Sequence, residues 1–245
     1  MAKVRKDDLV TFIGQNIQIF HKRKLDSLSR LHLEQILKRK NPYLFKAKNL
    51  NTAADLVKSI LDAHLSSQEE GIFGHFLEEL AIFVCEKSNR GIKSSTEGID
   101  LEFEKRGVRY LVSIKSGPNW GNSRQISKMR EDFRKAKRII GMNTPQKRVV
   151  AVNGCCYGKD DSPDKGDYLK LCGQRFWEFI SNNRNLYTEI IEPLGHAAKE
   201  KNDKFIEEHA KVVNKFTLQF TRKYCDRSGK ILWRKLVKFN SGKRN

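Results

Sequence analysis

Three side chains of different chemistry are spaced so that one β-hairpin would bring them together. Asp100 lies in a segment where apolar and charged residues alternate, and Ser113 and Lys115 lie in a second such segment. A glycine-containing turn at 106–107 separates the two segments. If the hairpin closes with this two-residue turn, antiparallel pairing sets Asp100 opposite Ser113 and makes Lys115 a diagonal neighbour. An acid, a hydroxyl and an amine then share one face of the hairpin.

These residue types suit the hydrolysis of a phosphodiester bond. That reaction uses a hard divalent cation held by carboxylate and phosphate oxygens, and a positioned group that orients or deprotonates the attacking water. Asp100 can hold Mg²⁺, and Lys115 can contact the scissile phosphate or help to activate water. A solvent-exposed hairpin with ordinary charge pairs has the same pattern, so the hairpin residues alone leave both interpretations open.

The elements that would position these side chains predict an α/β fold. A period of two, or a continuous apolar run, predicts strands at 98–104, 108–115 and 148–155. Helical spacing predicts helices that pack on this sheet at 71–88 and 123–140. The second face of the hairpin would carry the apolar residues Ile99, Leu101, Val112 and Ile114. We therefore expect a mixed central sheet flanked by helices, with helical N- and C-terminal regions.

The rest of the chain is predicted to be mainly helical. Helical patterns occupy 7–40, 52–64, 173–182 and 195–225. Asn41-Pro42 ends the first of these, and polar residues at 66–69 break the second from the helix that follows. Since no internal repeat or clear interdomain linker appears, we expect one catalytic domain over 1–245. Its helical N-terminal region, catalytic core and helical C-terminal region would span 1–65, 70–160 and 165–245.

The charge balance points to a polyanionic partner. The chain has 48 Lys and Arg against 29 Asp and Glu, a formal net charge of +19. This exceeds what solubility requires. A ribosomal or architectural protein that only coats nucleic acid would have a similar excess. The apolar fraction of 38% favours a packed core over a disordered basic protein.

The five cysteines are odd in number and form no C-x-x-C pair, so they predict reduced, mostly buried residues and no zinc site. No segment approaches the length of apolar sequence that a membrane span needs. The six histidines are scattered without metal-ligand or HNH-like spacing, which argues against a zinc or histidine nuclease. We expect a protein of the prokaryotic cytoplasm.

The predicted hairpin resembles a known catalytic motif. The segment GIDLEFEKRGVRYLVSIKSG is similar to the hairpin of PD-(D/E)xK nucleases, with Gly98-Ile99-Asp100 in the place of "PD" and Ser113-Ile114-Lys115 in the place of "(D/E)xK". Three stretches also resemble restriction endonucleases of the PmeII type: SIKSGPNWGNS, VVAVNGCCYG and DKGDYLKLCGQRFWEFIS. This resemblance extends from about residue 70 to the C-terminus. It implies a restriction-endonuclease-like fold, Mg²⁺ as the cofactor and double-stranded DNA as the substrate.

The resemblance leaves one acidic residue to be found, because Ser113 stands where most of the superfamily carries a second carboxylate. Glu78 is the first candidate for this catalytic and metal-binding acid, because the string GHFLE is similar to a G-x-x-x-E motif in the helix before the hairpin of many such nucleases. Glu131 is the second, since some restriction enzymes with S-x-K take the acid from an Arg-Glu pair in the next helix. A helical wheel nevertheless points Glu131 away from the sheet. Glu102 is the third candidate.

A loop and the helix after it carry the side chains that we expect to contact DNA. These are Asn119, Trp120, Asn122, Arg124 and Lys128. Asn can pair with adenine, Trp can wedge or stack between bases, and the cations and the helix N-terminus can contact phosphates. The alternatives are that Trp120 only pins the loop to the core and that the cations form a solvated helix face.

Three functions fit these observations. The first is a site-specific type II restriction endonuclease, which the PmeII-type stretches favour. The second is a repair or junction-resolving nuclease on the same fold, and the third is a basic nucleic-acid-binding protein without enzymatic activity. For the first function we expect a homodimer, because two active sites related by a two-fold axis cut both strands most simply.

Overall fold

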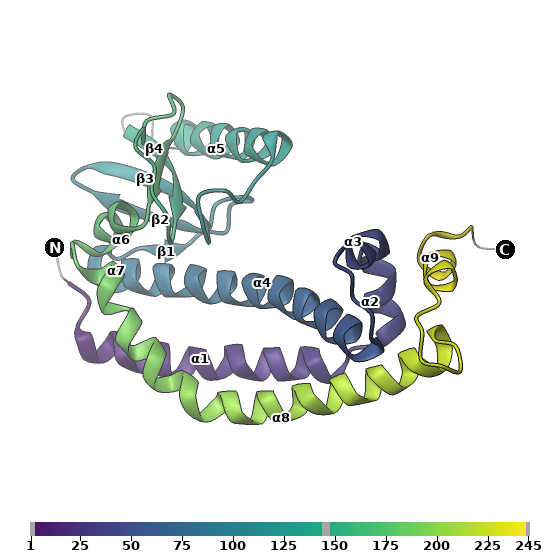
Figure 1. The fold of residues 1–245 in the computed structure, drawn as a ribbon. Coiled ribbons are helices and arrows are strands. Elements are labelled where there is room, and N and C mark those ends of the chain that lie inside the picture. Colours follow the sequence, from purple (N-terminus) through teal and green to yellow (C-terminus); the bar gives the residue numbers. More distant parts are fainter. Residues whose placement is uncertain (1–2, 144–147, 244–245) are drawn as a thin grey trace. The chain divides into compact units, whose positions relative to one another are not determined.

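A five-stranded mixed sheet and several long helices make up the fold (Figure 1). The computed structural model describes residues 3–143 and 148–243. In chain order the elements are α1 (Lys6–Ser29), α2 (Leu33–Arg39), α3 (Pro42–Ala47), α4 (Ala53–Asn89), β1 (Ile92–Lys93), β2 (Leu101–Lys105), β3 (Val108–Lys115), α5 (Ser123–Asn143), β4 (Arg148–Cys155), β5 (Leu169–Cys172), α6 (Gln174–Ser181), α7 (Leu186–Glu189), α8 (Ile191–Tyr224) and α9 (Trp233–Ser241).

The chain divides into two compact units. The first unit comprises Met1–Ile17 and Phe73–Ala197, and it contains the sheet. The second comprises Gln18–Ile72 and Ala198–Asn245, and its described elements are helices. The boundary falls inside α1, α4 and α8. The predicted single catalytic domain over 1–245 stays a prediction.

The sheet has the order β1-β2-β3-β4-β5. β2 pairs antiparallel with β1 and β3, whereas β3–β4 and β4–β5 are parallel pairs. The predicted strands at 108–115 and 148–155 are confirmed as β3 and β4, and the predicted helix between them is α5, which makes the crossover of this parallel pair. The sequence did not predict β1 or β5, because strands of two and four residues are too short to establish a period.

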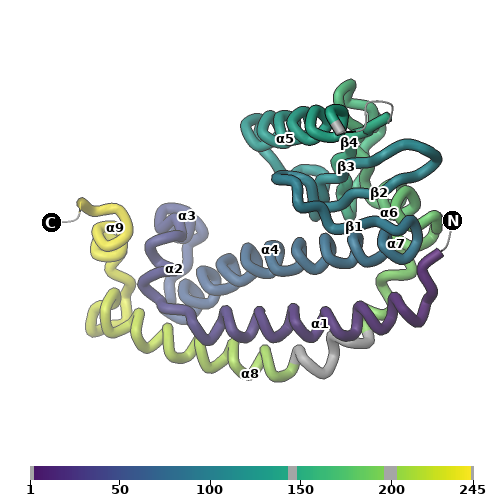
Figure 2. Tube along the Cα trace, turned by 180° about the vertical axis from the view of Figure 1, so that it is seen from behind, coloured from purple at the N-terminus to yellow at the C-terminus, as the bar shows by residue number. Residues whose placement is uncertain are grey.

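Helices cover both faces of the sheet in the first unit, as both views of the chain show (Figures 1 and 2). On one face, Val112 and Ile114 of β3 join a core cluster with apolar residues of α4, α6 and the start of α1. On the other face, Leu111 packs with Met129 and Phe133 of α5. Successive residues of β3 thus contribute to opposite cores, which is the expected alternation of a strand buried on both sides. The predicted α/β class is confirmed.

The start of the hairpin differs from the prediction. The register sets Glu102 opposite Leu111, as a two-residue turn at 106–107 requires, but the regular ladder ends at Leu101 rather than at residue 98. The N–H of Asp100 donates to the carbonyl of Val112 at 2.9 Å, one residue short of the predicted partner, Ser113. The expected pairing of Asp100 with Ser113 across a regular ladder is therefore wrong.

A turn before β2 explains this change. Gly98 has a φ of +77°, a conformation that glycine adopts readily, and the N–H of Ile99 donates back to the carbonyl of Thr96 at 3.1 Å. Ile99 consequently packs in the α5-facing cluster with Leu111, whereas Leu101 packs in the other core. The prediction that Ile99 shares the face of Leu101 is wrong, because alternation holds only within the regular strand.

The predicted break at residues 66–69 is also wrong, since α4 continues through them from Ala53 to Asn89. The polar side chains there make helix-compatible contacts. The Ser67 hydroxyl donates to the carbonyl of Ala63 at 3.0 Å, one turn earlier in α4. Gln68 accepts a hydrogen bond from Ser27 of α1, and Lys24 pairs with Glu69 at 2.8 Å. Because residues 66–69 contain no proline, the helix can continue through them, and their polar side chains bind α1 instead of forming a loop.

The second unit has its own apolar core of residues from α1 to α4, α8 and α9. Asn41 accepts hydrogen bonds from the N–H groups of Tyr43 and Leu44 and so caps α3, which begins at Pro42. The sequence predicted that the first helical region ends at Asn41-Pro42. In the structure, α2 ends at Arg39, just before this dipeptide, and α3 begins at Pro42. None of the described helices is long and apolar enough to cross a membrane. The five cysteines are free, and four of them are buried.

Gly154 of β4 allows a test of the packing between the sheet and α6. A Cβ atom at this position would lie 2.2 Å from a ring carbon of Phe176. Because the core cannot admit this atom without moving the ring, Gly154→Ala should lower the free energy of unfolding by about 2 kcal/mol. The matched control is Gly14→Ala in α1, where no neighbouring atom lies within 4 Å of the new Cβ. Urea denaturation that finds the two variants equally stable would contradict this account.

Candidate active site

The candidate site lies where β3 ends and the chain turns toward α5. Lys115 is the last residue of β3, and its carbonyl accepts a hydrogen bond from the N–H of Cys156 at 2.9 Å. The site therefore occupies the carboxyl end of a parallel strand pair, the usual ligand-binding edge of open α/β sheets. Residues 116–122 lead from this edge to α5.

The backbone of β3 fixes the carboxylate of Asp100. Asp100 is half-buried, and its Oδ2 accepts a hydrogen bond from the N–H of Ile114 at 2.6 Å. The hairpin therefore holds the carboxylate beside the final residues of β3, although Asp100 lies outside the regular ladder. A charge-assisted bond to a backbone donor in a buried strand gives this side chain one preferred orientation.

Glu78 of α4 lies near enough to Asp100 and Lys115 for their charges to affect its pKa. Burial raises the pKa of Glu78 above its usual value, and the nearby carboxylate of Asp100 raises it further. The neighbouring side chains of His75, Lys93 and Lys115 oppose this rise in the pKa of Glu78. Glu78, Asp100 and Lys115 therefore share one electrostatic environment, although they come from α4, the turn before β2 and β3.

Gly74 brings α4 close to the end of β3. A Cβ atom on Gly74 would lie 3.6 Å from the Oγ of Ser116, the residue after Lys115. Gly74 lies one helical turn before Glu78, so the close approach of the helix carries Glu78 toward the same edge of the sheet. The glycine and the acid of the string GHFLE thus face the end of β3 together.

A cation–π contact and two hydrogen bonds connect Lys115 to the middle of the sheet. The Nζ of Lys115 lies 5.2 Å from the centroid of the Trp120 ring, and the Nε1 of Trp120 donates to the Oδ1 of Asn153 at 3.1 Å. The Nδ2 of Asn153 donates to the carbonyl of Ser113 at 3.2 Å. Asn153 is 1% exposed, so its side chain has a fixed place in the sheet. Trp120 is pinned to the sheet, the alternative considered for it from the sequence.

Asn153 was not among the site residues predicted from the sequence. The available signal was an amide side chain inside VVAVNGCC, an otherwise apolar strand pattern, because a buried amide needs hydrogen-bonding partners. Ser113 lies opposite Asn153 in the β3–β4 register and is 2% exposed. The serine is therefore a buried residue of the sheet beneath Trp120 and Lys115.

The two other candidate acids have partners elsewhere. Glu102 is buried and accepts hydrogen bonds from the guanidinium of Arg109, at 2.6 Å, and from the Ser94 hydroxyl. Glu131 is exposed on α5, as the helical wheel predicted, and forms an ion pair with Lys135 at 2.8 Å. Among the three candidates, Glu78 is the acid whose pKa responds to Asp100.

Besides Trp120, two of the expected DNA-contacting residues have partners within the chain. The Oδ1 of Asn122 accepts from the N–H of Gln125 at 3.1 Å, while the N–H of Asn122 donates to the Oε1 of Gln125 at 2.9 Å. This reciprocal pair is a capping box that starts α5. Lys128 forms ion pairs with Asp132 at 2.8 Å and Glu97 at 3.4 Å.

Asn119 and Arg124 are exposed, and neither has a hydrogen-bonding or ion-pair partner among the described residues. Among the five residues expected to contact DNA, these two therefore have side-chain polar groups without a partner among the described residues.

The loops that follow β3 and β4 interlock. A Cβ on Gly117 would lie 2.3 Å from the Tyr157 ring, and a Cβ on Gly158 would lie 2.5 Å from Pro118. The N–H of Tyr157 also donates to the carbonyl of Ser116 at 3.1 Å. Glycine at both positions therefore lets the two loops pack directly against each other beside the candidate site.

The fold and this site together define a class of protein. A mixed sheet flanked by helices, with an acid held beside a terminal lysine of the hairpin, is consistent with a restriction-endonuclease-like fold. The family model described as "Type II restriction endonuclease EcoO109I" matches residues 7–202. The chain therefore belongs to this restriction endonuclease family. Among the curated proteins compared with the chain, none matches it. The roles assigned to individual site residues stay predictions.

The raised pKa of Glu78 predicts a pH-dependent cost to stability in metal-free protein. Ionisation of Glu78 disfavours the folded state above the raised pKa, and this penalty disappears as the pH falls below the unfolded value, about 4.3 for glutamate. Glu78→Gln should therefore raise the melting temperature near pH 7 and have little effect near pH 3.5. The exposed control Glu131→Gln should bring no such gain. A lower melting temperature for Glu78→Gln at pH 7 would refute the assigned environment.

Proposed function

We propose that the protein is a Mg²⁺-dependent endonuclease of the PD-(D/E)xK type that hydrolyses double-stranded DNA at specific sites. Family membership supports an endonuclease that acts on DNA. The excess of 48 Lys and Arg over 29 Asp and Glu supports a polyanionic substrate. The observation that carries the proposal is the carboxylate of Asp100 held by the N–H of Ile114 at 2.6 Å, next to Lys115 at the end of β3, with Glu78 near enough for Asp100 to raise its pKa. The resemblance to the PmeII type supports site-specific cleavage.

The side chains at this edge fit Mg²⁺. Glu78 and Asp100 are carboxylates close enough for one to raise the pKa of the other, so a divalent cation would relieve their repulsion. Within residues 3–143 and 148–243, no three His, Cys, Asp or Glu side chains are grouped to hold a metal ion by themselves. Two carboxylates are nevertheless sufficient, because Mg²⁺ is usually bound by one or two carboxylates together with water and substrate phosphates.

Each side chain then has a distinct task. When bound, the cation would polarise the scissile phosphate and activate water. Asp100 and Glu78 would hold it from the hairpin and from α4, and Asp100 would keep its orientation through the bond to Ile114. Lys115 would contact the phosphate as a cation, with Trp120 limiting the positions of its ammonium group.

Asn153 would act as a positioning residue. Through its bonds to Trp120 and to the backbone of β3, it fixes the ring against which Lys115 lies. Ser113 would contribute to this support from inside the sheet. Asn119, Arg124 and the first turn of α5 would contact DNA, with phosphate contacts setting the position of the duplex and groove contacts reading its sequence.

The first test concerns the two residues of the hairpin. Asp100→Ala and Lys115→Ala should each reduce cleavage of plasmid DNA by about a hundredfold or more, since each removes a group that acts on the reacting phosphate. Both variants should still bind DNA in a gel-shift assay without metal. Glu78→Gln should show a similar loss of cleavage, and Glu131→Gln should cleave like the wild type. Wild-type cleavage by Asp100→Ala and Lys115→Ala would exclude this site.

The second test concerns assembly. We propose a homodimer on DNA, because a two-fold arrangement presents one active site to each strand of a palindromic sequence. Light scattering with detection of both protein and DNA should give two protein chains for each cognate duplex. A single chain per duplex, together with cleavage of both strands, would contradict the dimer and leave the site assignment unaffected.

A further inference from the structure

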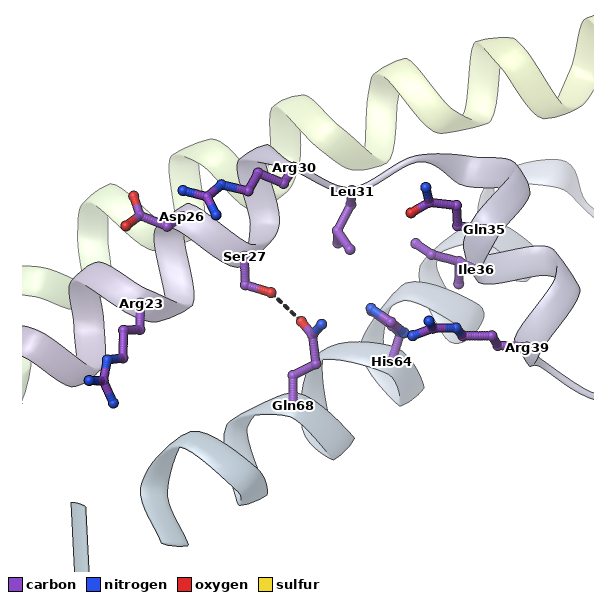
Figure 3. A pocket seen from close by; sticks show the side chains of 10 residues that line it. All are labelled: Arg23, Asp26, Ser27, Arg30, Leu31, Gln35, Ile36, Arg39, His64 and Gln68. Carbon is purple, nitrogen blue, oxygen red and sulfur yellow. Dashed lines mark hydrogen bonds between the residues drawn. The ribbon is translucent and has the colours of Figure 1, made fainter. Parts of the chain in front are cut away.

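The second unit contains a cavity of about 440 Å³ whose lining is rich in arginine (Figure 3). Its walls come from α1 and the turn after it, from α2 and from α4. The lining residues that carry the argument are Arg23, Arg30, Arg39, His64, Leu31 and Ile36. We call this cavity the arginine pocket. It belongs to the second unit alone, whereas Asp100 and Lys115 belong to the first.

The charges around the arginine pocket are not balanced by the chain. Three guanidinium groups line it with a single carboxylate, that of Asp26. Arg23, Arg30 and Arg39 are exposed, and none forms an ion pair with a described residue. Because three cations and one carboxylate line the same cavity, its net charge is positive and would stabilise a bound anion.

His64 supplies an independent observation. It is 8% exposed, and its Nε2 is buried with no hydrogen-bond partner among the described residues. Figure 3 shows the His64 side chain extending from α4 toward the part of the pocket that Leu31 and Ile36 border. A buried ring nitrogen without a partner costs free energy unless a ligand or water completes its hydrogen bond.

The surroundings of His64 favour an anionic ligand. Burial lowers the pKa of His64, and the positive charges of Lys40 and Arg39 lower it further. Across the pocket, the Ser27 hydroxyl donates to the Oε1 of Gln68, which joins α1 to α4 (Figure 3). The site thus combines a preformed polar wall with an unpartnered imidazole nitrogen and an excess of positive charge.

We propose that the arginine pocket binds a phosphate group, which Arg39 and the neighbouring His64 contact, while Arg30 adds positive charge to the lining (Figure 3). Guanidinium groups match phosphate oxygens with paired N–H donors, which makes phosphate a better fit than a single-point anion. The cavity is larger than one phosphate needs, and Leu31 and Ile36 offer an apolar surface to the rest of the ligand. The phosphate comes either from a free nucleotide or from the backbone of duplex DNA.

The test compares two double variants of equal net charge, each in the absence of Mg²⁺ so that cleavage plays no part. Arg30→Gln with Arg39→Gln removes two cations from the pocket. Lys22→Gln with Lys58→Gln removes two exposed cations from α1 and α4 that do not line it. Calorimetry would measure the binding of inorganic phosphate and of adenosine 5′-monophosphate, and fluorescence anisotropy would measure the binding of a duplex oligonucleotide.

The arginine variant should bind its ligand about tenfold more weakly than the lysine variant, because charge-assisted hydrogen bonds are lost. If this difference appears with phosphate or the mononucleotide, the ligand is a free phosphate compound. If it appears with the duplex alone, the ligand is a backbone phosphate. Equal affinities of the two variants for all three probes would overturn the proposal, even if the protein cleaves DNA as proposed above.

A second measurement covers the case in which the arginine variant fails to fold, which circular dichroism would reveal. In the wild-type protein, the nuclear magnetic resonance signals of the His64 imidazole should shift when the binding probe is added. The other histidines serve as internal controls. A His64 signal that stays unchanged with phosphate, the mononucleotide and the duplex would likewise overturn the proposal.

Discussion

The pairing of β3 on both edges is the constraint on which the site depends. β3 bonds to β2 on one side and to β4 on the other, and its side chains enter cores on both faces. A strand held in this way has no freedom to shift register, since a slip of one residue would exchange its two faces. The end of β3 therefore holds three site groups in fixed positions relative to one another. These are Lys115, the N–H of Ile114 that binds Asp100, and the carbonyl of Ser113 that binds Asn153.

Sequence patterns predicted the parts of the fold where local periodicity and tertiary contacts agree. β3, β4 and the position of α5 follow from strand and helix periods, because both faces of the two strands and one face of α5 are buried as the patterns require. The position of Ile99 did not follow, since Gly98 turns the chain before β2 begins. The continuity of α4 through 66–69 depends on partners in α1 that no local pattern reveals.

The candidate site was predictable to a similar extent. Asp100 and Lys115 were found from the hairpin pattern, and Glu78 from a family resemblance, because each lies at a recognisable spacing. Asn153 was missed, as its contribution depends on two hydrogen bonds across separate segments. The capping role of Asn122 was also missed, although Gln125 three residues later was a local signal for it. Ion pairs such as Lys128–Asp132 similarly depend on the folded chain to decide which cations remain available.

The interlocked glycines beside the site have a consequence for protein engineering. Gly117 and Gly158 fix the two loops against Tyr157 and Pro118, and the indole of Trp120 is tied to the sheet. Asn119 thus stands exposed between two anchored points of the loop. If Asn119 contacts DNA as proposed, a mutational library aimed at selectivity can vary this exposed position, whereas a side chain at either glycine would force Tyr157 or Pro118 to move. Asn119 can therefore be substituted without a clash, whereas Gly117 and Gly158 cannot.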